Sequence, residues 1–116
     1  MAMPDYLHNP LYRKVFFEDI GRLLESFRKS IVLLKSNAGN QGALTDLHHA
    51  AHSLKGTTLV MELSEISAAA EKMEAELKAK LKAQEYDLPA GALQGIEADF
   101  HKIVGLLEAL RTDSPG

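Results

Sequence analysis

Apolar side chains recur every three or four residues along most of the chain, and this spacing restricts the fold more than any other feature. It is the repeat of an α-helix that buries one stripe and leaves its other faces in water. The alternation that marks a half-buried strand is absent. The stripes are Phe16, Ile20, Leu23, Leu24, Phe27, Ile31 and Leu34; Leu44, Leu47, Ala51, Leu54, Thr58 and Met61; Leu63, Ile66, Ala70, Met73, Leu77 and Leu81; and Leu93, Ile96, Phe100, Ile103, Val104, Leu107 and Leu110.

Breaks in this pattern mark the ends of the predicted helices. Residues 36–42, SNAGNQG, and 86–91, YDLPAG, are rich in turn-forming residues, and Pro89 suits the first turn of a new helix. No Gly or Pro separates the second and third stripes, so we assign the N-cap there to Ser64. Residues 5–12 are interpreted as a short leading helix interrupted near Pro10. Helices joined by short connections pack antiparallel, so we predict an all-α, up-down-up-down four-helix bundle.

Length, charge and composition exclude several classes of protein. A chain of 116 residues suits one domain, which we expect over residues 1–116 with a core of about 15–110 and frayed termini. A net charge of −3 gives no electrostatic reason to bind nucleic acid or an anionic membrane. The absence of Cys excludes disulfides and thiolate catalysis, and no apolar run approaches the roughly 20 residues of a membrane helix. We therefore expect a cytoplasmic protein, and a monomer because four helices close their own core.

The predicted second helix carries the segment AHSLKG, residues 51–56, on an exposed face. Projected at about 100° per residue, His52 lies away from the apolar stripe, and Lys55 at i+3 shares its face. Gly56 follows one turn after His52, although a mid-helix Gly costs about 1 kcal/mol relative to Ala. Because no internal packing repays that cost on a solvent face, we interpret Gly56 as clearance for an approaching partner.

These residue types suit the transfer of a phosphoryl group. A neutral imidazole is a competent nucleophile near physiological pH, which makes His52 the candidate acceptor. Phosphoryl transfer asks the protein mainly for positioning and for a cation near the phosphoryl oxygens, which Lys55 supplies. The chain has no Gly-rich phosphate loop, so we expect a phosphocarrier without an ATP site rather than an enzyme.

Residues 51–74, AHSLKGTTLVMELSEISAAAEKME, resemble the histidine-containing phosphotransfer (HPt) domain of bacterial phosphorelays. His52, Lys55 and Gly56 match its His-x-x-Lys-Gly pattern, and Met73-Glu74 follows at the expected interval. Residues 19–34 look like the first long helix of the family, and the resemblance covers about residues 15–110. Many members have a Gly about ten residues after the histidine, where this chain has Glu62, so we expect a different turn or a longer helix there.

The resemblance implies a function and its partners. His52 would accept a phosphoryl group on Nε2 from a receiver-domain aspartate and pass it to another receiver aspartate. Lys55 would stabilise the phosphohistidine, and Gly56 would let the receiver dock closely. The partner would be the receiver of a response regulator or of a hybrid sensor histidine kinase. Mg²⁺ would sit in that receiver, and this chain would hold no cofactor. The helical projection adds four residues to the docking face: Thr45, His48, His49 and Leu59.

Two other functions remain open. His48 and His52 have the i, i+4 spacing of a helical metal site, although no third ligand is evident on the helix. The second alternative is a non-catalytic four-helix adaptor, or a docking module that uses the same face without carrying phosphate. Ser53 has no acidic and histidine partners arranged as a triad, which argues against hydrolytic catalysis.

Overall fold

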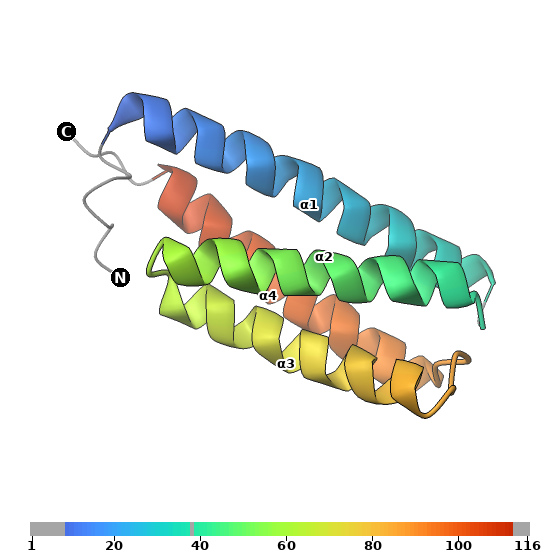
Figure 1. Ribbon diagram of the computed structural model, residues 1–116. Helices are drawn as coiled ribbons and strands as arrows, with labels where there is room; N and C mark the ends of the chain where they lie inside the picture. Colours follow the sequence, from blue (N-terminus) through green and yellow to red (C-terminus); the bar gives the residue numbers. More distant parts are fainter. Residues whose placement is uncertain (1–8, 38, 113–116) are drawn as a thin grey trace.

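The computed structural model describes residues 9–37 and 39–112, which form four α-helices and no strand. The helices are α1 (Pro10–Ser36), α2 (Gln41–Val60), α3 (Ser64–Lys82) and α4 (Ala90–Thr112). They run alternately up and down the bundle (Figure 1). The α1–α2 and α3–α4 connections lie at one end, and the α2–α3 turn lies at the other. The predicted antiparallel four-helix bundle is confirmed.

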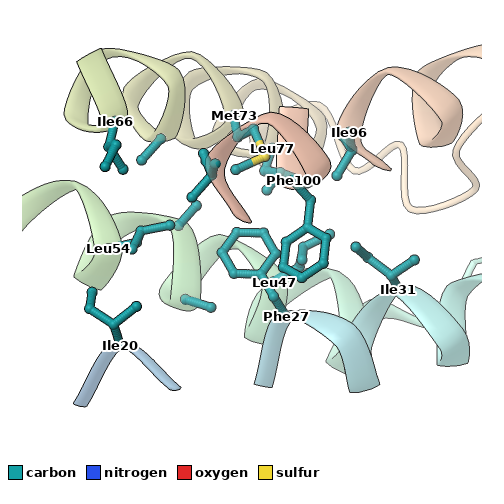
Figure 2. Packing of buried hydrophobic residues seen from close by; sticks show 14 of the residues in the cluster. Ile20, Phe27, Ile31, Leu47, Leu54, Ile66, Met73, Leu77, Ile96 and Phe100 are labelled. Carbon is teal, nitrogen blue, oxygen red and sulfur yellow. The ribbon is translucent and has the colours of Figure 1, made fainter. Parts of the chain in front are cut away.

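The four apolar stripes meet in one core. Phe27 of α1 stacks on Phe100 of α4 with ring centroids 5.4 Å apart and an interplanar angle of 25°. Met73 and Leu77 of α3 reach the same region of the core (Figure 2). Phe27, Met73 and Leu77 are fully buried, and burying a side chain of this size contributes about 1.5–3 kcal/mol. Six stripe residues are only partly buried at the edges of the core: Leu23, Leu24, Met61, Leu81, Leu93 and Val104.

Helix α2 packs most extensively on α3, and the hydroxyl group of Ser67 bonds across this contact. The buried Ser67 hydroxyl of α3 donates to the Lys55 carbonyl oxygen of α2 at 3.4 Å. The buried Thr58 hydroxyl donates within α2 to the Leu54 carbonyl oxygen at 2.7 Å. One interhelical hydrogen bond thus accompanies the apolar packing of α3 on the second half of α2.

Helix α1 begins earlier than its apolar stripe. Pro10 occupies the first helical position, where a missing N–H costs nothing, and the Asn9 side chain accepts from the Leu11 amide at 2.9 Å. Residues 10–12 are thus the first turn of α1, and the predicted separate leading helix is wrong for them; residues 5–8 lie outside the described residues. At the other end of the chain, Pro89 directly precedes α4, one residue before the predicted position.

The α2–α3 turn ends α2 without a glycine. The Glu62 amide donates to the Leu59 carbonyl and the Leu63 amide to the Thr58 carbonyl, at 3.0 and 2.8 Å, which is the Schellman pattern. Glu62 adopts the left-handed conformation with φ 59°, which glycine takes at lower cost. The N-cap of α3 is the buried Leu63, so the N-cap assigned to Ser64 is wrong by one residue.

Within the described residues, no helix is both long enough and apolar enough to cross a membrane.

Candidate functional site

His52 stands on the outward face of α2, where 65% of its side chain is exposed. Its Nδ1 lies 3.1 Å from Oε1 of Glu74 on α3. An ionised carboxylate can only accept a hydrogen bond, so Nδ1 carries the proton and donates. The neutral ring then has its lone pair on Nε2. The contact with Glu74 therefore selects the tautomer in which Nε2 is the free, nucleophilic nitrogen.

Lys55 completes a three-residue cluster with His52 and Glu74. Its ammonium Nζ lies 2.9 Å from Oε2 of Glu74, so one carboxylate bridges the imidazole and the ammonium. The Glu74 side chain is only 14% exposed. The hydrogen bond from Lys55, helped by that from His52, lowers the pKa of Glu74 even though burial acts in the opposite direction. Glu74 is therefore an anion at neutral pH, held between two groups of α2.

The packing of α3 places Glu74 at this site. Ala70, Met73 and Leu77 are fully buried, so Glu74, which follows Met73, emerges at the edge of the α2–α3 interface. The Ser67 hydroxyl, two turns earlier on α3, bonds to the backbone of Lys55 itself. The sequence pattern included Glu74 but assigned it no role, because its contact with His52 spans 22 residues and depends on helix register.

Gly56 has no packing role inside the bundle. A Cβ atom built at this position would meet no other atom within 4 Å. The helix therefore does not need a glycine here to approach a neighbour. The role of Gly56 as clearance for a partner stays a prediction, because several other glycines of the bundle are equally open.

The other predicted docking residues lie around His52 with unequal exposure. His49 is exposed, as is Leu59 with an exposed fraction of 61%, whereas Thr45 and His48 are half-buried. His48 Nε2 is fully buried and has no hydrogen-bond partner within the described part of the chain. Burial lowers the pKa of His48, with Glu74 opposing the shift, so this ring is neutral at physiological pH. His48 is more buried than the helical projection implies, and Glu74 and Lys78 of α3 lie near enough to act on its charge.

The metal-site alternative gains no ligands from the fold. Across residues 9–37 and 39–112, no three His, Asp or Glu side chains come together in a way that could hold a metal ion. His48 and His52 share a helix face, but Nδ1 of His52 already bonds to Glu74.

Comparison with known proteins places the chain in a family. The Hpt domain family model matches residues 11–113, almost the whole chain. The chain belongs to the Hpt domain family. The fold of this Hpt domain is similar to the CheA phosphotransferase domain from Thermotoga maritima, with a TM-score of 0.77 and 21% sequence identity. That match covers 85% of this chain and 93% of the other.

A longer protein shares part of the sequence of this Hpt domain. The chemotaxis protein CheA of Treponema pallidum (strain Nichols) is 32% identical over 69 residues. The match covers 58% of this chain but only 8% of the CheA protein. The Hpt domain is thus a histidine phosphotransfer module of two-component signalling, and it corresponds to a small part of that relative.

Proposed function

We propose that this Hpt domain accepts a phosphoryl group on Nε2 of His52 from a receiver-domain aspartate and passes it to another receiver aspartate. The observation that carries the proposal is the His52–Glu74 hydrogen bond. It fixes the proton on Nδ1 and leaves Nε2 as the nucleophile, on a side chain that is 65% exposed.

The transfer balances without a cofactor in this chain. The Nε2 lone pair attacks phosphorus, the Nε2–P bond forms, and the P–O bond to the receiver aspartate breaks. The aspartate leaves as a carboxylate, and the imidazole ring becomes a cation that keeps its Nδ1 proton. Glu74 lies 3.1 Å from that nitrogen and stabilises the positive charge as it develops. The same steps in reverse deliver the phosphoryl group to a second receiver.

Lys55 and Gly56 serve the incoming group in different ways. The Lys55 side chain is 27% exposed, and its ammonium shares Glu74 with His52. In this proposal Lys55 is the cation that stabilises the phosphoryl oxygens. Gly56 has no side chain to obstruct a receiver that approaches the helix one turn beyond His52. In this proposal the receiver supplies Mg²⁺, the chain acts as a cytoplasmic monomer, and it draws no phosphate from ATP.

The test is transfer from a phosphorylated receiver domain in Mg²⁺ to the purified chain. His49→Gln is the matched control for His52→Gln, because His49 is an exposed histidine on the same helix. We expect the wild type and His49→Gln to gain an acid-labile, alkali-stable phosphoryl group and His52→Gln to gain none. Transfer that survives in His52→Gln assigns the acceptor to another residue. No transfer to a folded wild type from a panel of receivers favours the adaptor function.

A further inference from the structure

His48 lies one turn before His52 on α2, and the proposed transfer gives it no role. The residue is half-buried, and its Nε2 atom is fully buried with no hydrogen-bond partner among the residues that the structure describes. Folded proteins pair nearly all of their buried polar atoms, so an unpaired ring nitrogen beside a reactive site calls for an explanation. The Cβ atoms of helix residues four apart lie about 6 Å from each other, so His48 and His52 are direct neighbours on α2.

Burial and four titratable side chains act on the charge of the His48 ring. Burial has the largest effect and lowers the pKa of His48, as do His49 and His52 of α2 and Lys78 of α3. Glu74 of α3 acts in the opposite direction and raises that pKa. His48 is therefore neutral at physiological pH, and Glu74 is the anion that favours a proton on this ring.

The charge of Glu74 is already balanced in the unphosphorylated chain. Its Oε1 atom lies 3.1 Å from Nδ1 of His52, and its Oε2 atom lies 2.9 Å from the Lys55 ammonium. The carboxylate and the ammonium together carry no net charge, and His52 in its nucleophilic form is neutral. No excess negative charge is therefore left to hold a proton on His48.

Phosphorylation of His52 removes this balance. A phosphoryl group brings about two negative charges, and the His52 ring that keeps its Nδ1 proton gains one positive charge. The site therefore becomes more negative by about one charge, while Lys55 serves the phosphoryl oxygens as well as Glu74. Negative charge near an imidazole favours its protonated form, and salt screens this effect least for groups that are partly buried.

We propose that His48 takes up one proton from solvent when His52 is phosphorylated, and that the resulting imidazolium stabilises the phosphorylated site. This inference rests on the proposed function and adds a regulatory property, the coupling of phosphate storage to pH. The proton adds to the bare nitrogen of the neutral His48 ring, and no bond to phosphorus forms or breaks there. His48 therefore acts on the reaction through charge and does not touch the transferred group.

The pH dependence of transfer follows from this proton uptake. Phosphorylation raises the pKa of His48 from its lowered resting position, so the uptake takes place in the pH window between the two pKa values. In that window the phosphorylated chain holds one proton more than the unphosphorylated chain. The equilibrium constant for transfer from the receiver to His52 therefore rises as the pH falls, by up to about tenfold per pH unit.

The first test follows the histidine ring signals of the wild-type chain by NMR as the pH is varied, before and after phosphorylation by a receiver. We expect the titration midpoint of His48 to rise by about one pH unit or more when His52 is phosphorylated. His101 is the internal control, because it is exposed on α4, diagonally across the bundle from α2, and its midpoint should not move. A His48 midpoint that stays in place or falls overturns this proposal, while a phosphorylated His52 leaves the proposed function standing. A wild type that no receiver phosphorylates removes both.

The second test measures the phosphate equilibrium between receiver and chain across the same pH range. His48→Gln replaces the ring with a polar side chain that does not titrate, and His101→Gln is the matched control. We expect the equilibrium constant to depend less steeply on pH in His48→Gln than in the wild type, by up to about tenfold per pH unit, and His101→Gln to keep the wild-type slope.

The slope separates proton uptake from an effect on packing. A change in packing alone shifts the equilibrium constant equally at every pH and leaves the slope intact. Equal slopes in His48→Gln and the wild type therefore overturn the proposal. The first test needs no variant, so it decides the proposal even if His48→Gln fails to fold.

Discussion

Replacing Gly56 with Ala should make the protein more stable and the phosphotransfer slower. The added methyl group meets no atom within 4 Å, so it introduces no clash inside the bundle. Ala is favoured over Gly by about 1 kcal/mol in a helix interior, and we expect that gain in the free energy of unfolding. For a domain of this size the gain corresponds to a rise in Tm of about 4 °C.

The same methyl group should obstruct an approaching receiver. Overpacking a fitted contact by one methyl group costs about 1–2 kcal/mol, which is a loss of roughly 5- to 30-fold in kcat/KM for transfer. Thermal unfolding and transfer kinetics measure the two effects on one sample. Gly105→Ala is the matched control, because Gly105 is an exposed mid-helix glycine of α4 that also has nothing within 4 Å. It should gain stability and keep full transfer. Unchanged transfer in Gly56→Ala, or lower stability, would refute this reasoning.

Three further substitutions test the structure. Glu74→Gln should lower the free energy of unfolding by about 1–3 kcal/mol at pH 7, because an ionised acceptor is lost. The pKa of Glu74 is lowered in the folded state, so its contribution is present above the unfolded pKa and disappears as the pH falls through the folded one. Urea unfolding at pH 7 and at a series of acidic pH values should show the difference shrink as the pH falls. Glu62→Gly should raise the free energy of unfolding by about 0.5–1 kcal/mol, and Tm with it. Glycine relieves the strain of the left-handed conformation at residue 62, and its larger loss of chain entropy on folding offsets part of that gain. A fall in Tm would contradict the Schellman turn. Phe27→Ala should cost about 3–5 kcal/mol in denaturant unfolding, since Phe27 is fully buried, and a loss below 1 kcal/mol would contradict the packing in Figure 2.

The apolar periodicity is sufficient to predict the bundle, because the buried side chains of all four helices recur every three or four residues. The stripes around Ile20, Leu54, Met73 and Ile103 are buried where the spacing placed them. The exposure of His52 followed from the same projection, since it depends only on which side of α2 faces the core. These are local properties, and a single helix determines them.

The parts that the sequence did not predict depend on contacts between elements or on backbone detail. The bond between Glu74 and His52 requires the register of α3 against α2. The partial burial of His48 depends on how the neighbouring helices pack against α2, which the wheel of one helix does not contain. The start of α1 was within reach, because Asn9 followed by Pro10 is a recognised N-terminal signal, but the apolar stripe begins only at Phe16.

In the proposed mechanism, Glu74 holds Nδ1 of His52 so that Nε2 carries the phosphoryl group. Phosphorylating ¹⁵N-histidine-labelled chain with a receiver and recording long-range ¹H–¹⁵N and ³¹P spectra identifies the modified nitrogen directly. We expect phosphorus on Nε2 of His52, with the Nδ1 proton retained. Phosphorus on Nδ1 of His52, or on His48 or His49, would contradict it.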